Sequence, residues 1–199
     1  MQCGAGWSQR GEEKIIDGYF GGKLGRFLDI GAWDGIEMSN TRQLAEAGWS
    51  GVCVEPAVTP FRSLMRNYKG FGEISLVHAA IMPRRGLSVF WDTADALSTF
   101  DAKHMRKWQI GSGVPFNEIW TAHVTFADLF AVLPGPYDFI SIDAEGNSVA
   151  LLESLDPMRV AAKVVSVEHD DRLADIATWA TAYGFRQIGR TEENVLLGK

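Results

Sequence analysis

The sequence predicts an α/β protein built on a doubly wound, mostly parallel sheet, and two observations carry this prediction. Short apolar runs alternate with segments of helical periodicity, as β-α-β units require; the runs are residues 26–30, 51–54, 74–81, 137–142 and 163–167. Two further runs, 185–189 and 194–197, are joined by a short polar link and predict a closing hairpin. Five parallel strands followed by a hairpin describe an open sheet with helices on both faces.

The segments between these runs have the periodicity and end signals of helices. The predicted helices are residues 12–20, 39–47, 59–68, 128–132, 149–155 and 173–183. Gly184 is the expected stop of the last helix. In the helix at 59–68, Phe61, Leu64 and Met65 share one face, which we expect to pack in the core.

Composition limits the possible function classes. At 199 residues and 46% hydrophobic content, the chain suits one domain over residues 1–199. Its net charge of −6 is spread along the sequence and argues against nucleic acid as the main partner, because phosphate binding needs a basic face. Cys3 and Cys53 predict neither a disulfide framework nor a metal cluster and fit a reducing, cytoplasmic setting. Without an apolar run of roughly 20 residues, we expect a soluble protein with no membrane partner.

The most informative stretch is residues 26–35, where an apolar run ends in Asp29 and a turn bounded by Gly31 and Gly35 follows. A strand, a tight turn and a helix in this order form the place where α/β proteins bind ligands, and the glycines would let the backbone approach a bound molecule closely. Twenty residues after Gly35, Glu55 ends the second run, where it is placed to accept hydrogen bonds from both hydroxyls of a ribose. The two features imply an adenosine-containing cofactor.

The details of the turn favour S-adenosylmethionine over a dinucleotide. A dinucleotide site needs the pattern G-x-G-x-x-G, whereas this chain has G-x-x-x-G preceded by Asp29. That carboxylate would repel a pyrophosphate but suits the cationic methionine part of S-adenosylmethionine. An ordinary pair of loop glycines is the alternative interpretation of the same stretch.

Residues 83–136 are longer than a regular β-α-β connection, and we interpret them as an insertion that shapes the substrate site. Within it, 87–91 and 119–126 are apolar enough to be strands, 102–108 is a basic and aromatic cluster, and 111–113 is expected to be mobile. One interpretation is a substrate lid in which Trp108 or Trp120 stacks on a sugar ring and a Lys or Arg contacts an anionic group. The other is a solvated helix face with buried tryptophans.

Polar side chains follow the fourth and fifth runs, at the edge where open α/β sheets bind ligands: Asp143, Glu145, Glu168 and His169. Asp143, Glu168 and His169 are the predicted catalytic residues. His169 is the natural general base because its ordinary pKa lies near neutrality; the alternative is an orienting histidine bonded to Glu168 or Asp143. The same three side chains could instead hold Mg²⁺, which would lower the pKa of an acceptor hydroxyl.

The chain resembles the FkbM-type S-adenosylmethionine-dependent methyltransferases. The resemblance rests on stretches that occur in family order over nearly the whole chain, namely residues 8–12, 29–35 with 39–41, 48–56, 142–146 and 166–169. It implies the class I methyltransferase fold, in which a seven-stranded, Rossmann-like sheet has an antiparallel last strand. It also implies O-methylation, commonly of sugar or polyketide-like hydroxyls.

The resemblance assigns residues to the cofactor pocket as well. Gly31, Ala32 and Gly35 would line the methionine part of the cofactor, and Glu55 would hold its ribose. Supporting residues would be Ser8, Gln9, Asn40 and Thr41. Asp29, Asp143 and Glu145 complete the expected cofactor site, with Glu145 serving the amino group.

Two other functions stay open at this point. An NAD(P)-dependent sugar oxidoreductase or epimerase would share the sheet, although the sequence lacks a glycine-rich pyrophosphate loop and a correctly placed Tyr/Lys pair. A non-catalytic S-adenosylmethionine- or nucleotide-binding module would keep the fold and lose turnover. For the enzyme, the expected partner is a hydroxyl-bearing small molecule or glycan.

Overall fold

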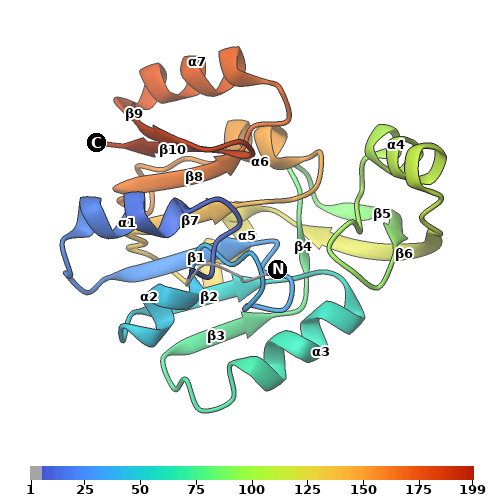
Figure 1. The fold of residues 1–199 in the computed structure, drawn as a ribbon, viewed down its shortest axis with the longest axis horizontal. Coiled ribbons are helices and arrows are strands. Elements are labelled where there is room, and N and C mark those ends of the chain that lie inside the picture. Colours follow the sequence, from blue (N-terminus) through green and yellow to red (C-terminus); the bar gives the residue numbers. More distant parts are fainter. Residues whose placement is uncertain (1–5) are drawn as a thin grey trace.

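The computed structural model describes residues 6–199, so Cys3 lies outside the described residues. Seven strands form the main sheet: β1 (Arg26–Ile30), β2 (Ser50–Val54), β3 (Ile74–Val77), β7 (Phe139–Ile142), β8 (Val164–Glu168), β9 (Arg186–Arg190) and β10 (Asn194–Gly198). Their order across the sheet is β3-β2-β1-β7-β8-β10-β9 (Figure 1).

The directions of the strands confirm the predicted fold class. The neighbouring strands β3, β2, β1, β7 and β8 run parallel to one another. β10 runs antiparallel to both of its neighbours, β8 and β9. β1 lies between β2 and β7, so the chain winds outward in both directions from β1. Open α/β sheets bind their ligands at such a point, beyond the carboxyl ends of the strands.

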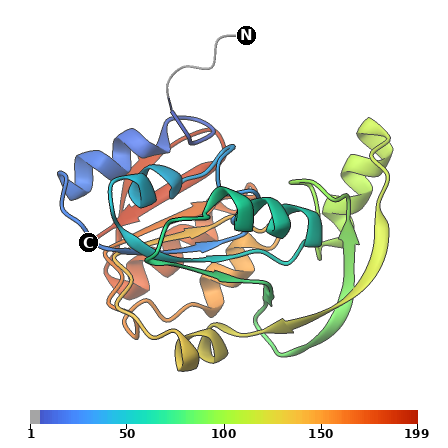
Figure 2. The same cartoon turned by 90° about the horizontal axis from the view of Figure 1, so that it is seen from below.

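Helices cover both faces of this sheet (Figure 2). On one face lie α1 (Glu12–Phe20), α2 (Arg42–Glu46) and α3 (Val58–Asn67), and on the other lie α5 (Phe126–Val132), α6 (Ser148–Ser154) and α7 (Leu173–Tyr183). Because successive side chains of a strand point to opposite faces, Phe27 joins the apolar cluster beneath the first group and Leu28 the cluster beneath the second. The predicted helices at 12–20 and 173–183 match α1 and α7 residue for residue, and Gly184 ends α7 with a φ of 72°.

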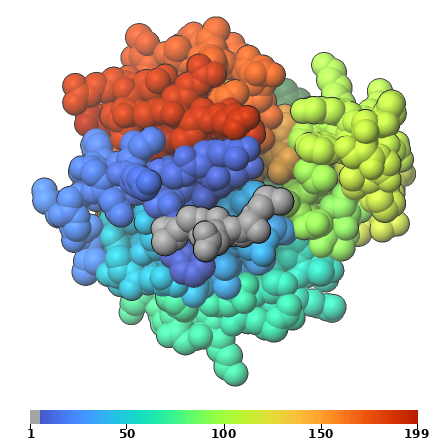
Figure 3. All heavy atoms as spheres, viewed as in Figure 1, coloured from blue at the N-terminus to red at the C-terminus, as the bar shows by residue number. Residues whose placement is uncertain are grey.

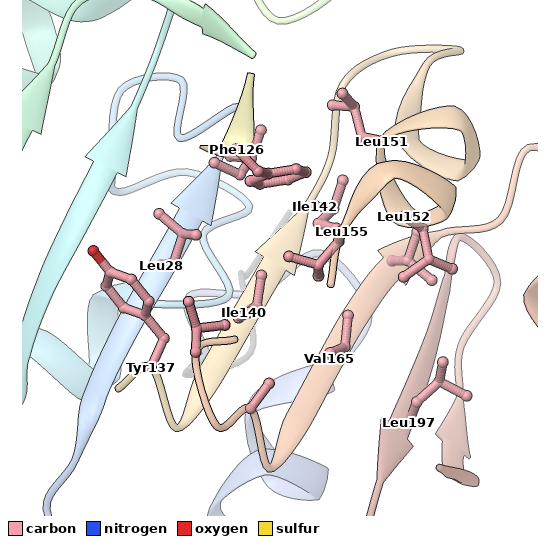
Figure 4. Packing of buried hydrophobic residues seen from close by; sticks show 14 of the residues in the cluster. Leu28, Phe126, Tyr137, Ile140, Ile142, Leu151, Leu152, Leu155, Val165 and Leu197 are labelled. Atoms are coloured by element: carbon pink, nitrogen blue, oxygen red, sulfur yellow. The ribbon is translucent and has the colours of Figure 1, made fainter. Parts of the chain in front are cut away.

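The larger apolar cluster lies between the sheet and the second group of helices (Figure 4). Ile140, Ile142 and Val165 project from β7 and β8 toward Leu152 and Leu155 at α6, and each of these side chains is at most 1% exposed. Removing this much apolar surface from water is the main favourable contribution to folding. The cluster therefore fixes the strands whose ends carry the polar residues predicted above.

A second sheet stands beside the carboxyl edge of the first. It consists of β4 (Ala80–Ile81), β5 (Gly86–Asp92) and β6 (Asn117–Val124) in the order β4-β6-β5. β5 and β6 pair antiparallel, and α4 (Ala102–Ser112), which connects them, lies at the outer end of this ribbon (Figures 1 and 2). We call residues 83–124 the insertion arm; the remaining residues of the predicted insertion, up to 136, include α5, which packs on the main sheet.

Two of the strand predictions are wrong in detail. The run 74–81 is not one strand, because β3 ends at Val77 and Ala80 already pairs with His123 of the second sheet. Phe126 starts α5 instead of ending a strand, since Thr125 caps that helix: its Oγ1 accepts a hydrogen bond from the Asp128 N–H, and the Asp128 carboxylate accepts one from the Thr125 N–H.

Two expectations about helices are also wrong. The segment 111–113, expected to be mobile, instead closes a helix: Gly111 and Ser112 continue α4, and Gly113 ends it in the left-handed conformation. Met65 is 53% exposed, so only part of the predicted apolar stripe of α3 packs in the core.

Within residues 6–199, no helix combines the length and the apolar character needed to cross a bilayer.

Leu152→Ala tests the core described above. The side chain is fully buried against β7 and β8, so we expect the substitution to lower the free energy of unfolding by about 2–5 kcal/mol in urea denaturation. Leu24→Ala is the matched control, because Leu24 is 68% exposed and its loss should cost about 0.5 kcal/mol or less. Equal effects of the two substitutions would contradict this packing.

Candidate functional site

A cavity of about 600 Å³ opens at the carboxyl edge of the main sheet, between the sheet and the insertion arm. In Figure 3 the yellow-green arm stands apart from the rest of the surface, with a hollow between them. Most predicted site residues line this cavity: Gln9, Asp29, Gly31, Ala32, Asn40, Glu55, Asp143, Glu145, Glu168 and His169. Gly35, Thr41 and Ser8 do not.

The glycines of the β1–α2 turn are required by the packing of the chain itself. Gly31 has a φ of 80°, and a Cβ there would overlap the backbone carbonyl of Asp143. Gly35 has a φ of 73°, and a Cβ there would overlap the side chains of Tyr68 and Leu64. Gly31 therefore lets two loops cross at the cavity, whereas Gly35 lets the turn pack on α3.

Asp29 and Thr41 form a buried pair beneath this turn. The Thr41 hydroxyl donates a hydrogen bond of 2.6 Å to the Asp29 carboxylate. Burial nevertheless raises the pKa of Asp29 to about 6, with the hydrogen bond from Thr41 acting in the opposite direction. Asn40 is fixed in a similar way, because its amide donates to the Ser141 hydroxyl on β7 at 3.2 Å. Thr41 thus orients a cavity residue without reaching the cavity.

Glu55 occupies the predicted position at the end of β2. Its two carboxylate oxygens accept hydrogen bonds from the backbone N–H groups of Trp33, at 3.0 Å, and Ala57, at 2.6 Å. Burial raises the pKa of Glu55 to about 7, although both N–H donors favour the ionised form. The side chain is thus held rigidly between the β1 and β2 loops, at the wall of the cavity.

The segment before α1 is anchored beside the same cavity. The Ser8 hydroxyl accepts a hydrogen bond from the Gly11 N–H at 3.1 Å, which places Ser8 in a local turn. Glu12 is fully buried and accepts hydrogen bonds from the side chains of Thr191, at 2.6 Å, and Asn194, at 3.1 Å, at the β9–β10 hairpin. This anchor presents Gln9 to the cavity.

Asp143 and Glu168, at the ends of the adjacent strands β7 and β8, form a buried acidic pair. Burial raises the pKa of both carboxyls well above the ordinary range. The charge of Asp143 raises the pKa of Glu168 further, and the charge of Glu145 raises that of Asp143, while a hydrogen bond from Glu168 acts to lower the pKa of Asp143. Glu168 also accepts a hydrogen bond of 2.9 Å from the Ser148 hydroxyl. Because like charges this close resist joint ionisation, the pair retains at least one proton at neutral pH.

His169 lies at the cavity, but backbone groups occupy both of its ring nitrogens. Nε2 is 2.8 Å from the Glu192 carbonyl oxygen, to which it donates, and Nδ1 accepts a hydrogen bond from the Asp171 N–H at 3.1 Å. These contacts orient the ring through partners other than the predicted Glu168 and Asp143. In this geometry His169 offers no free lone pair to an acceptor hydroxyl, so a role as general base stays a prediction that needs a rearrangement.

His104 is a cavity residue that the sequence analysis did not single out. It projects from α4 of the insertion arm, and its Nε2 lies 3.0 Å from a carboxylate oxygen of Glu145. The sequence marked residues 102–108 as a basic and aromatic cluster, but nothing in the spacing links His104 to a carboxylate 41 residues later. Only the docking of the arm brings the two together.

The tryptophans of the arm have different positions. Trp108 lines the cavity with Lys107, whereas Trp120 is 66% exposed and does not line it. Eleven carboxylate side chains but one lysine, and no arginine, line the cavity among residues 6–199. The cavity is therefore strongly acidic, which suits a cationic ligand.

Backbone strain is concentrated around this cavity. Seven non-glycine residues have a positive φ in the described part of the chain, and five of them line the cavity: Trp33, Met38, Glu145, Asp170 and Asp171. Such conformations cost about 1–3 kcal/mol each and persist where the surrounding structure enforces them, which is typical of functional sites.

The described residues do not form the predicted Mg²⁺ site. In residues 6–199, no group of three or more His, Cys, Asp or Glu side chains is arranged so that it could hold a metal ion. Of the three predicted ligands, His169 has both ring nitrogens bonded to backbone groups, which leaves it no lone pair for a metal ion. The donor set therefore does not fit a divalent cation.

This chain is similar to known proteins in its fold, but not in its sequence. No protein-family model matches the sequence, and no curated protein sequence matches it. Among solved structures, the METTL16 MTase domain is similar over 94% of this chain and 63% of its own, with 14% identity and a TM-score of 0.50. EvdMO1 is similar over 95% of this chain and 41% of its own, also with 14% identity and a TM-score of 0.50.

The fold is that of a class I, Rossmann-like methyltransferase. Monomeric WbdD is a third similar structure, with 12% identity, a TM-score of 0.50, and coverage of 94% of this chain and 39% of its own. At these identities the comparisons establish the fold alone, and this chain spans less than two thirds of each of the three proteins.

Glu168→Gln tests the burial of the acidic pair. Because the folded-state pKa of Glu168 is raised, the folded state binds more protons than the unfolded state above pH 4 to 5, and stability falls as the pH rises. Glutamine removes this penalty and keeps an acceptor for Ser148. We therefore expect the variant to gain stability over the native protein, and the gain to widen from pH 5 to pH 8 in urea denaturation.

Glu73→Gln serves as the control for this experiment, because Glu73 is exposed and does not line the cavity. Its stability relative to the native protein should change little between the two pH values. A Glu168→Gln difference that is constant with pH would show that Glu168 is ionised in the folded protein.

Proposed function

We propose that this protein is an S-adenosylmethionine-dependent methyltransferase that transfers a methyl group to a hydroxyl of a sugar, glycan or other small molecule. The observation that carries the proposal is the position of Glu55. In a methyltransferase fold, this buried carboxylate ends β2 and faces the same cavity as the Gly31 turn after β1. That arrangement suits an adenosine whose ribose hydroxyls donate to Glu55.

The cavity fits the three parts of the cofactor. Its volume lies within the roughly 300–1,000 Å³ typical of ligand pockets. Pro56 and residues 79–82 (Ala, Ala, Ile and Met) offer an apolar wall near Glu55 for the adenine. Toward Gly31, the buried carboxyls of Asp29 and Asp143 offer negative charge for the cationic methionine part. The resemblance to FkbM-type enzymes supports the same assignment.

A hydroxyl acceptor fits the remaining part of the cavity. The insertion arm closes this side and contributes Trp108, whose ring could stack on a sugar. The scarcity of basic side chains among the eleven carboxylates disfavours nucleic acid and other phosphate-rich acceptors. We therefore propose a neutral or cationic polyhydroxylated acceptor, in place of the anionic one that the basic cluster of the sequence suggested.

For methyl transfer, the protein mainly has to align the acceptor oxygen with the methyl group of the cofactor. Bound S-adenosylmethionine supplies an activated methyl group on a positively charged sulfur, and the acceptor oxygen must approach it in line. The β1, β2 and β7 loops would hold the cofactor, the insertion arm would hold the acceptor, and their mutual contact would exclude water. A hydroxyl acceptor must also give up its proton to a base.

Calorimetric titration with S-adenosylmethionine and S-adenosylhomocysteine tests the cofactor site. We expect micromolar binding of both, and Glu55→Ala should weaken it at least about tenfold by removing the ribose acceptor, about 1.4 kcal/mol. Glu73→Ala, far from the cavity, is the matched control and should bind like the native protein.

Because Glu55 also anchors two backbone N–H groups, Glu55→Gln should be measured beside Glu55→Ala, with a thermal melt of each variant to show that it is folded. Absence of binding in the native protein would overturn the proposal. Binding of NAD(P) instead would favour the oxidoreductase alternative, and cofactor binding without transfer to any hydroxyl acceptor would favour the binding module.

The acidic cavity predicts a pH-dependent preference for the charged cofactor. S-adenosylmethionine carries a sulfonium charge that S-adenosylhomocysteine lacks. Because Asp29 and Glu55 have pKa values of about 6 and 7, they ionise between pH 6 and pH 8. The ratio of the two dissociation constants should shift toward S-adenosylmethionine over this interval, because the newly ionised carboxylates attract the sulfonium and not the neutral thioether. A ratio independent of pH would place the sulfonium away from these carboxyls.

A further inference from the structure

The insertion arm is docked on the loop after β7 through two contacts with one residue. The Thr99 hydroxyl donates a hydrogen bond of 2.6 Å to the backbone carbonyl of Glu145, and His104 Nε2 lies 3.0 Å from the Glu145 carboxylate. The His104 side chain is 12% exposed and lines the cavity. The arm thus places an imidazole at the cavity, with a carboxylate behind it.

The local backbone fixes this pair. Glu145 has a φ of 45° and Gly146 a φ of 88°, so two consecutive residues of the loop adopt the left-handed conformation directly beneath α4. A Cβ on Gly146 would lie 3.2 Å from the Cβ of His104, which shows how closely the helix approaches the loop. A strained conformation at a residue whose side chain faces a half-buried histidine is typical of a site that must be held in one geometry.

We propose that His104 is the general base of the reaction and that Glu145 is its positioning residue, so that the insertion arm supplies the base to the site. This inference rests on the proposed methyl transfer to a hydroxyl. It assigns Glu145 to the histidine, in place of the amino group of the cofactor.

The chemistry follows from which nitrogen faces Glu145. Nε2 lies 3.0 Å from the Glu145 carboxylate, close enough for an ion pair, although the two groups are not aligned as a hydrogen bond. When Nε2 carries the proton that faces this carboxylate, Nδ1 keeps a free lone pair, and no hydrogen bond among the described residues involves Nδ1. The acceptor hydroxyl gives its proton to Nδ1 while its oxygen forms the new bond to the methyl carbon, and the electrons of the broken carbon–sulfur bond stay on sulfur. Glu145 stabilises the resulting imidazolium, which then returns its proton to water. His169 lacks such a lone pair.

The charges around His104 support this role. Facing it are Glu145, Glu168 and Asp170 from the main sheet, with Asp101 and Lys107 on its own helix. Burial acts to lower the pKa of His104, but the adjacent Glu145 carboxylate, with the charges of Glu168 and Asp170, outweighs it and the pKa is raised. A base must be neutral to accept a proton, so the rate should rise with pH through this pKa.

Nitrogen-15 NMR of the histidine side chains tests the pair without an acceptor. His104→Gln assigns the resonance. In the native protein we expect His104 to titrate above an ordinary histidine and to be protonated on Nε2 alone when neutral. Glu145→Gln should lower the pKa, while Glu118→Gln, exposed on β6, should leave it unchanged. The proposal would be overturned if the neutral ring of His104 were protonated on Nδ1, or if Glu145→Gln left the pKa of His104 unchanged.

A second measurement separates this proposal from the proposed function. Calorimetry of His104→Gln with S-adenosylmethionine should give the native affinity, and kcat with a hydroxyl acceptor should fall by about 10²–10⁴. A kcat of His104→Gln equal to the native value would overturn the proposed role of His104 as base, but not the proposed methyltransferase function. If the native protein did not bind the cofactor, the proposed function would be overturned, whatever the NMR result.

Discussion

The crossing of the Gly31 turn over the backbone of Asp143 is the constraint on which the site depends. β1 and β7 are adjacent and parallel, and the Asp143 N–H donates to the Ile30 carbonyl, while the N–H of Gly31 donates to the carbonyl of Val54 on β2. These hydrogen bonds hold the carboxyl ends of β1, β2 and β7 next to one another. A side chain at position 31 would overlap the Asp143 carbonyl and force these loops apart, so the arrangement at the cavity depends on this glycine.

The same convergence buries several carboxyl groups where they repel one another. Asp29, Glu55, Asp143 and Glu168 all have raised pKa values, chiefly because burial disfavours the charged forms. Buried carboxyl groups of this kind cost stability as the pH rises, and a cationic ligand beside them would relieve that cost. The electrostatics of the site thus point to a positively charged occupant, independently of the fold.

Much of the fold was predictable because its signals are local. Apolar runs ending in acids, with amphipathic segments between them, fix the strand positions, and the parallel arrangement then brings Asp29, Glu55, Asp143 and Glu168 to one edge. What the sequence could not indicate depends on tertiary contact. The partners of His169 are backbone groups of loops distant in sequence, and His104 reaches Glu145 only because the insertion arm folds back over the sheet.

A crystal structure of the protein with S-adenosylhomocysteine would show whether the cavity binds the cofactor. We expect the nucleoside in the cavity, with both ribose hydroxyls within hydrogen-bonding distance of the Glu55 carboxylate and the thioether sulfur facing His104 across the space left for an acceptor. A ligand bound elsewhere, or a ribose that does not contact Glu55, would contradict this expectation.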